Sequence, residues 1–197
     1  RARLEVLEHE LDVKTGGRTR GFVAVALGIF WILSPIALYA WGARAAIGHR
    51  ELLASMVPSS GVALALGVWA RESLFKTPMN RRMVGMVSAT LLATTVAIVG
   101  AWLAGASPPA TGAFMVLVWG VSAAVAVPVV GRGFLPTPLL MGAAFLGAAA
   151  RPDVWPLFAS AANLVFTVNI AILWRDRVPW KNRDEPASRG RRRGSPA

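Results

Sequence analysis

Six long apolar segments, separated by short polar links, dominate the hydrophobic pattern of this chain. They cover residues 21–42, 52–70, 83–105, 111–130, 134–150 and 154–174. A helix that spans a bilayer needs about 20 apolar residues, with a range of about 17 to 25. The segment 134–150 is the shortest, so it is either a tilted span or a re-entrant segment, and we favour the span. The pattern predicts an all-α integral membrane bundle of six transmembrane helices with short loops.

The segments on either side of this transmembrane domain, residues 21–174, are polar. In residues 1–20, leucines recur at helical spacing between acidic residues, which predicts a cytoplasmic amphipathic juxtamembrane helix or linker. This helix is either a short surface element or the end of a coiled coil from an upstream domain. Because the chain begins at Arg1 rather than at a methionine, we expect an upstream cytoplasmic domain in the same protein. Residues 175–197 are basic and low in complexity, which predicts a disordered cytoplasmic tail.

The distribution of basic residues predicts the orientation of the helices. With the N-terminus inside, all but three of the 21 Lys and Arg residues lie on the inner side. The three exceptions are Arg44, Arg50 and Arg151. Because Lys and Arg are enriched in cytoplasmic loops, we expect a protein of the plasma (inner) membrane with both termini in the cytoplasm.

The net charge of +11 indicates an acidic partner. Only 16% of the residues are charged, against about 25% in soluble proteins, and the basic ones flank the apolar segments. Anionic lipid headgroups of the bilayer are therefore the expected partner, and nucleic acid is not. The residues expected to contact these headgroups are Arg71, Lys76, Arg81, Arg82, Arg175, Arg177, Lys181 and Arg183.

No predicted span contains an Asp, Glu, Lys, Arg or His side chain. Ion-coupled transporters usually keep such groups at membrane depth, and an intramembrane enzyme needs a nucleophile with its base or a metal cage. The chain also lacks cysteine, and its two histidines, His9 and His49, lie on opposite sides of the predicted topology. We therefore expect no catalytic residue, no cofactor and no metal site in this chain.

Two spans carry a proline beside serines. The first contains Ser34 and Pro35, and the second contains Pro58, Ser59 and Ser60. A proline leaves the carbonyl one turn back without its helical partner, and nearby hydroxyls can replace that partner. If the two helices pair, the prolines lie at similar depth in the outer half of the bilayer. The pattern indicates either ordinary kinks or a small outward-facing notch that admits a ligand.

Asparagines, tryptophans and small residues also stand out within the spans. Asn163 and Asn169 of the sixth span are expected to hydrogen-bond to neighbouring helices. Trp31 and Trp119 fall near mid-membrane, either for packing or for lining a pocket. Small residues spaced four apart in the third to fifth spans permit close helix packing, which serves either the bundle itself or a homodimer.

A segment in the N-terminal linker carries a family resemblance. Residues 3–11, Arg-Leu-Glu-Val-Leu-Glu-His-Glu-Leu, feed a multi-span region whose sixth span contains Asn-Leu-Val-Phe-Thr-Val-Asn at 163–169. This arrangement resembles the C-terminal membrane domain of bacterial membrane-bound serine/threonine kinases. The resemblance implies a sensor or anchor domain of a multidomain signalling protein, non-catalytic in itself, with a kinase domain upstream of residue 1.

The kinase resemblance covers only the linker and the bundle. The chain contains no glycine-rich loop with its lysine and no HRD or DFG sequence, so no kinase activity is assigned to its residues. Two other function classes fit a six-span bundle: a small-solute transporter or channel subunit, and an accessory or assembly protein that acts through helix packing.

Overall fold

The computed structural model describes residues 17–42 and 47–175, and within these ranges the chain forms helices and no strand. Six of the helices are long and apolar enough to cross a membrane, which confirms the predicted all-α bundle of six transmembrane helices. The protein is therefore a multi-pass membrane protein. The amphipathic helix or linker was predicted over residues 1–20, of which 1–16 lie outside the described residues and 17–20 belong to α2. The tail was predicted over 175–197, of which residue 175 ends α8 and 176–197 lie outside the described residues.

The six long helices follow the predicted spans closely. They are α2 (Gly17–Gly42), α3 (His49–Trp69), α5 (Pro78–Leu103), α6 (Pro108–Val130), α7 (Pro136–Ala150) and α8 (Trp155–Arg175). Three helical turns connect them: α4 (Arg71–Leu74), η1 (Arg132–Phe134) and η2 (Pro152–Val154). Together with η1, the short fifth segment becomes a 19-residue candidate span, which fits the span rather than the re-entrant alternative.

α5 and α6 begin earlier than the apolar pattern predicts, at residues 78 and 108 instead of 83 and 111. Polar caps cause the difference. The Thr77 hydroxyl accepts a hydrogen bond from the Asn80 backbone N–H at 3.2 Å, and the Ser107 hydroxyl accepts one from Ala110 at 3.4 Å. A proline follows each cap, and proline suits the first helical turn because no backbone donor is needed there.

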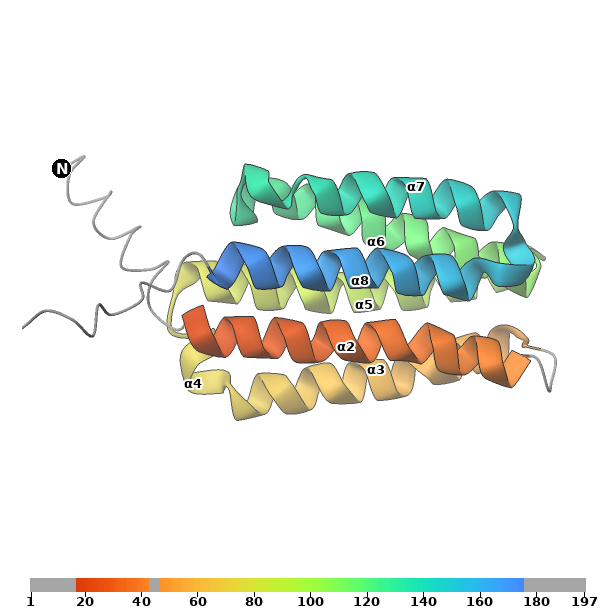
Figure 1. Cartoon of the computed structure of the whole chain (residues 1–197). Helices are drawn as coiled ribbons and strands as arrows, with labels where there is room; N and C mark the ends of the chain where they lie inside the picture. Colours follow the sequence, from red (N-terminus) through yellow and green to blue (C-terminus); the bar gives the residue numbers. More distant parts are fainter. Residues whose placement is uncertain (1–16, 43–46, 176–197) are drawn as a thin grey trace, which may run out of the picture.

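The six helices form two layers of three (Figure 1). In one layer α8 lies between α2 and α7, and in the other α5 lies between α3 and α6. The layers join along their edges, where α6 packs on α7 and α2 packs on α3. We name the two ends of the bundle by their contents: the α4 end holds the start of α2, α4 and η1, and the His49 end holds the start of α3 and η2.

Glycines allow α8 to approach its neighbours closely. A Cβ atom added to Gly28 of α2 would lie within 2.9 Å of the Thr167 Cβ of α8, and one on Gly147 of α7 would overlap the Phe158 ring. A Cβ on Gly120 of α6 would lie 3.3 Å from the Met141 Cβ of α7, which is a close but not overlapping contact. Gly120 and Gly147 therefore serve packing within the bundle, whereas a Cβ on Gly100 of α5 would meet no atom within 4 Å. The homodimer alternative stays a prediction.

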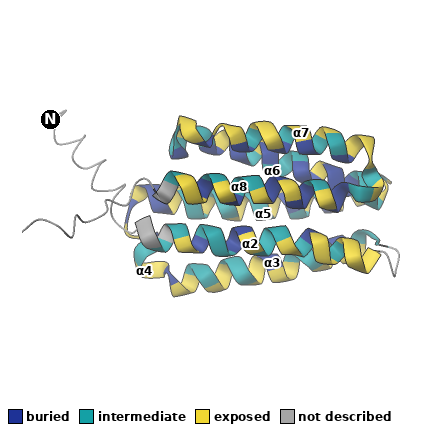
Figure 2. Ribbon diagram, viewed as in Figure 1, coloured by how far each residue is buried: buried dark blue, intermediate teal, exposed yellow. Residues whose placement is uncertain are grey.

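Burial is unequal among the helices (Figure 2). In α6, and in the span that contains α8, 39% of the residues in the most apolar 18-residue stretch are buried. In α3 and α5 the corresponding share is only 11%. Exposed apolar side chains, such as Val57 and Leu64 of α3, cover the outward-facing surfaces where lipid tails would lie. α3 and α5 are thus the least buried of the long helices, while α6 and α8 are the most buried.

Candidate functional site

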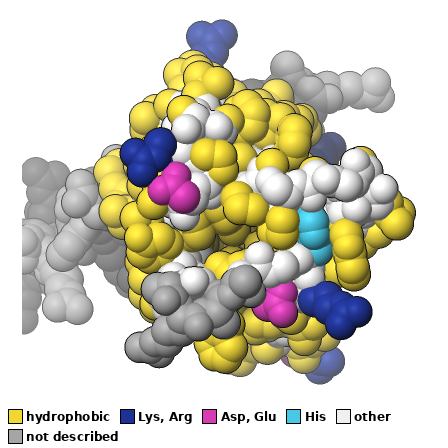
Figure 3. Space-filling view, turned by 90° about the vertical axis from the view of Figure 1, so that its right-hand side faces the viewer, with side chains coloured by type: hydrophobic (Ala, Val, Ile, Leu, Met, Phe, Trp, Pro, Cys, Tyr) yellow, Lys and Arg dark blue, Asp and Glu magenta, His cyan; other side chains and the backbone are white. Residues whose placement is uncertain are grey.

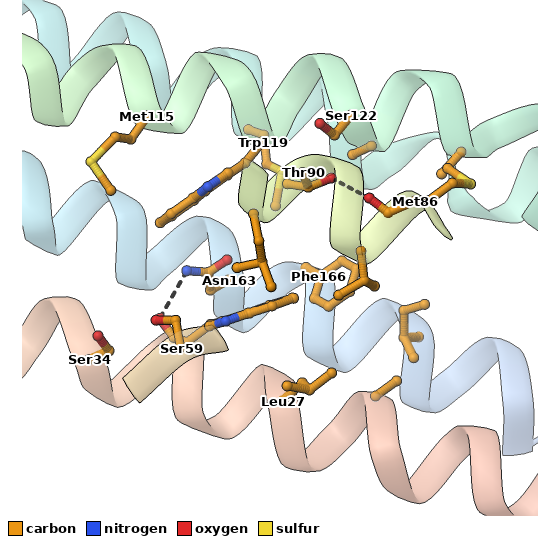
Figure 4. A pocket seen from close by; sticks show the side chains of 18 of the residues that line it. Leu27, Ser34, Ser59, Met86, Thr90, Met115, Trp119, Ser122, Asn163 and Phe166 are labelled. Atoms are coloured by element: carbon orange, nitrogen blue, oxygen red, sulfur yellow. Dashed lines mark hydrogen bonds between the residues drawn. The ribbon is translucent and has the colours of Figure 1, made fainter. Parts of the chain in front are cut away.

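A cavity of about 170 Å³ lies between the two helix layers (Figure 4). Five long helices supply most of its wall: α2, α3, α5, α6 and α8. The two middle helices, α5 and α8, contribute from opposite layers. Because the wall combines segments from the beginning and the end of the chain, the cavity exists only in the assembled bundle.

The wall of this central cavity is almost entirely apolar. None of the described residues that line it has an ionisable side chain. Five of the six methionines of the chain contribute: Met56, Met83, Met86, Met115 and Met141. Methionine is unbranched and polarizable, so such a wall adapts to the shape of an apolar guest.

Aromatic rings form the stiffer parts of the wall. On one side, Trp31 of α2 contacts Phe166 of α8 with ring centroids 6.1 Å apart, and Phe134 meets Phe166 edge-on at 6.0 Å. On the other side, the Trp119 indole N–H donates to the Thr94 hydroxyl at 3.0 Å. That hydroxyl in turn donates to the Thr90 carbonyl at 2.7 Å, which holds the Trp119 ring in place.

Asn163 of α8 satisfies a carbonyl that Pro35 leaves without a helical partner in α2. Pro35 has no backbone N–H, so the Trp31 carbonyl one turn back loses its helical partner. The Asn163 Nδ2 donates to this carbonyl at 2.9 Å, and the Ser160 hydroxyl donates to the next carbonyl, that of Ile32, at 2.9 Å. Pro35 and the interhelical hydrogen bonds are therefore one structural unit.

The proline and serine positions singled out in the first two spans divide into two groups. Ser34, Pro35 and Ser59 line the central cavity, whereas Pro58 and Ser60 are exposed on the outside of α3. Consecutive helical residues point about 100° apart, so only one of three successive positions faces the interior. The structure thus places three of the five residues in one interior cavity and two on the surface.

The two asparagines of α8 contact different helices. Asn163 reaches α2, as described above, while the Asn169 Nδ2 donates to the Thr137 hydroxyl of α7 at 2.9 Å. Asn163 lines the cavity and Asn169 does not. Asn169 therefore joins α8 to α7, away from the cavity.

The basic residues expected to meet lipid headgroups gather at the α4 end where they are described. Arg71, Lys76, Arg81 and Arg82 are all exposed there, and the Arg81 guanidinium donates to the Phe75 carbonyl at 3.2 Å. Arg175 ends α8 at the same end of the bundle. The other three expected residues, Arg177, Lys181 and Arg183, lie outside the described residues.

The opposite end carries a small polar network (Figure 3). His49 stacks on Trp102, with centroids 5.7 Å apart and ring planes 2° apart, and its Nε2 lies 3.0 Å from the Thr111 hydroxyl. The Thr111 hydroxyl also lies 3.1 Å from the Ser107 carbonyl, to which it can donate a hydrogen bond. His49 thereby ties α3 to α5 and α6. Among the described residues, no group of three His, Cys, Asp or Glu side chains could hold a metal ion.

A second hollow opens beside this network, with a volume of about 260 Å³. Prolines make up much of its wall, together with Tyr39, Asp153 and Trp155. Trp155 is buried against Gly112 and also lines the central cavity. Its ring therefore belongs to the partition between the two spaces.

Sequence reasoning found part of this site. The mid-membrane tryptophans, Trp31 and Trp119, both line the cavity. The methionines and the hydroxyl groups of Thr90 and Ser122 were missed. All six methionines fall within the helical region, and this concentration could have marked methionines as candidate lining residues. Comparisons with protein-family models, curated proteins and solved structures found no match to this chain.

Proposed function

We propose that this chain is a membrane-embedded sensor domain, non-catalytic in itself, which binds a small apolar molecule and passes the signal to a cytoplasmic domain of the same protein. The observation that carries the proposal is the central cavity, which has an apolar wall drawn from both helix layers. A neutral apolar molecule dissolved in the bilayer is the natural guest for such a wall, because a charged one would lose its hydration without gaining a partner.

α2 offers a route from the cavity to the α4 end. It supplies Trp31, Ser34 and Pro35 to the wall, and its first residues lie beside α4. Proline interrupts the helical hydrogen-bond ladder and is a common point of bending. A guest held against these residues favours one tilt of α2 over another, and a difference in affinity between the two tilts is what a sensor requires.

The transporter alternative receives less support from the same cavity. None of the described lining residues provides an ionisable group for coupling to protons or ions. A purely structural accessory role would not need an open space between the layers, since membrane bundles gain stability from close packing. The sensor proposal accounts for the cavity, and the experiment below separates it from transport.

The test measures whether filling the cavity moves the α4 end. The chain has no native cysteine, so spin labels can be attached at Thr19→Cys of α2 and Arg82→Cys of α5, both near that end. With toluene as the probe, we expect the label-to-label distance distribution to shift in nanodiscs. Labels at Ala40→Cys and Leu103→Cys report on the other end of the same helices as a reference.

Two matched variants control this measurement. Ala123→Leu fills the cavity from α6, whereas Ala124→Leu places the same side chain on the exposed face of that helix. The toluene response should vanish in the first variant and persist in the second. A response that survives Ala123→Leu, or toluene binding without any change at the α4 end, contradicts sensing through this cavity. Saturable flux of the probe across proteoliposomes would favour the transporter.

We also propose that the α4 end is cytoplasmic and binds anionic lipid headgroups. Among the described side chains, the α4 end carries Arg71, Lys76, Arg81, Arg82 and Arg132 against one acidic residue, whereas the basic and acidic residues balance at the His49 end. Such an excess marks the cytoplasmic side and attracts anionic lipid.

Neutralising two of these residues tests the lipid contact. We expect Arg81→Gln with Arg82→Gln to remove about 2 kcal/mol of the stabilisation that phosphatidylglycerol gives relative to phosphatidylcholine, at about 1 kcal/mol per basic residue. The measurement is thermal unfolding in nanodiscs of each lipid. Arg50→Gln with Arg151→Gln is the matched control at the His49 end and should keep the lipid preference. An equal loss in both pairs contradicts a localised contact.

A further inference from the structure

Asn163 brings an unused hydrogen-bond acceptor to an apolar cavity. Its side chain is only 2% exposed, and its Nδ2 is occupied by the Trp31 carbonyl. Its Oδ1 has no hydrogen-bond partner among the described residues. In Figure 4 this oxygen points away from the dashed bond to α2, on the side of the cavity that Asn163 lines. This oxygen keeps some accessible surface, because among the described side chains the fully enclosed acceptor without a partner is the Asn80 Oδ1. A guest that supplies a donor to the Asn163 Oδ1 therefore gains a hydrogen bond in an apolar surrounding.

The size and walls of the cavity favour a single ring. Its volume of about 170 Å³ is close to that of apolar cavities of ~150 Å³ which bind benzene. The neighbouring wall contains Trp31 and Phe166 on one side and Trp119 on the other. Aromatic side chains of this kind stack or meet edge-on with a ring held between them.

The polar groups that line the cavity are all neutral, which favours a neutral guest. The described lining residues offer no ionisable side chain, so a charged guest would meet no opposite charge. The hydroxyl groups of Ser34 and Ser122 also line the cavity and make no hydrogen bond with described residues. Ser34 lies less than one turn from Trp31, whose carbonyl Asn163 contacts, so its hydroxyl is a second neutral polar group on this part of the wall.

We infer that the central cavity binds a neutral, single-ring hydroxyl compound of the phenol type, whose hydroxyl donates to the Asn163 Oδ1 while its ring occupies the space between the aromatic side chains. This inference rests on the proposed sensor function, because it names the ligand class for the same cavity.

The test compares two ring probes that differ by one hydroxyl. Bromobenzene and 4-bromophenol both carry a bromine atom, which quenches tryptophan fluorescence at short range. In nanodiscs of the full chain, with probe concentrations corrected for partition into the bilayer, we expect saturable quenching by both. The phenol should bind about five- to tenfold more tightly, as one net hydrogen bond provides. In Ala123→Leu the saturable component should disappear, and in Ala124→Leu it should remain.

Replacing the acceptor should remove the preference without removing the site. In Asn163→Leu the two probes should bind with equal affinity. If this variant does not fold, the double variant Pro35→Ala with Asn163→Leu serves instead, because an alanine N–H can again pair with the Trp31 carbonyl. Ser34→Ala reports whether that hydroxyl contributes a second hydrogen bond.

The outcomes separate this inference from the proposed function. Equal affinities for the two probes in the unmodified chain overturn the hydroxyl ligand class and leave the apolar sensor cavity standing. Tighter saturable binding of 1-octanol, measured by displacement of the brominated phenol, overturns the ring. An absence of saturable binding by any probe overturns both proposals together. A preference for the phenol that persists after the asparagine is removed overturns the role of Asn163.

Discussion

Replacing Asn163 by leucine is expected to destabilise the bundle by about 1–2 kcal/mol, mainly because it leaves the Trp31 carbonyl without a donor. Hydrogen bonds between membrane helices average only about 0.6 kcal/mol, since partners are also found in less-packed states. This bond should exceed that average. Its acceptor is a backbone carbonyl that Pro35 has already deprived of its helical partner, so the Asn163 amide replaces a hydrogen bond that the α2 backbone cannot supply.

A double-mutant cycle isolates this coupling. In the Pro35→Ala background the backbone N–H at position 35 can pair with the Trp31 carbonyl, so Asn163→Leu should then cost little. The measurement is the free energy of unfolding of all four chains in the same detergent mixture. Additive effects at positions 35 and 163 would contradict the coupling. Asn169→Leu is the control on the same helix, because its partner is Thr137 and it should show no coupling to Pro35.

Gly28→Ala should destabilise the pair formed by α2 and α8, by about 1–3 kcal/mol, the usual cost of overpacking. The added Cβ would overlap the Thr167 hydroxyl and lie 2.8 Å from its methyl carbon and 2.9 Å from its Cβ. Rotation of the side chain cannot relieve this contact, because the Thr167 Cβ is fixed to the backbone. The Thr167 hydroxyl also donates to the Asn163 carbonyl at 2.7 Å, so a shift would disturb the α8 turn that faces α2.

A glycine with open space provides the comparison for this substitution. A Cβ on Gly67 of α3 would meet no atom within 4 Å, and alanine favours a helix over glycine by about 1 kcal/mol. Gly67→Ala should therefore leave stability unchanged or raise it. Thermal unfolding of both variants gives the sign directly. A loss for Gly67→Ala equal to that for Gly28→Ala would mean that the α2–α8 contact is not the cause.

The approximate residue range of each long helix could be predicted, because a backbone surrounded by lipid must satisfy its hydrogen bonds internally. Long runs without charge must be helical, since every backbone polar group needs an internal partner. The starts of α5 and α6 were less accurate, because the apolar pattern does not register a Thr77 or Ser107 cap followed by proline. The hydrophobic pattern describes lipid contact, whereas a cap depends on one hydroxyl and a backbone N–H.

The site was harder to predict because these helices are apolar on every side. In a soluble protein a polar face shows which side of a helix points outward, but here lipid and interior both accept apolar residues. The sequence alone therefore could not tell that Ser59 faces the cavity while Pro58 and Ser60 face outward. For the same reason, the positions of the methionines in the sequence did not show which side of each helix faces the cavity.

The sequence by itself determined the membrane spans, the absence of charge within them and the loss of one backbone hydrogen bond at Pro35. Only the tertiary structure decided that Asn163, more than a hundred positions later, would supply the missing hydrogen bond. The physical reason is that backbone hydrogen bonding and lipid solvation act locally along one helix. The pairing of α2 with α8, and the cavity that their partners enclose, depend on how side chains from distant helices fit together.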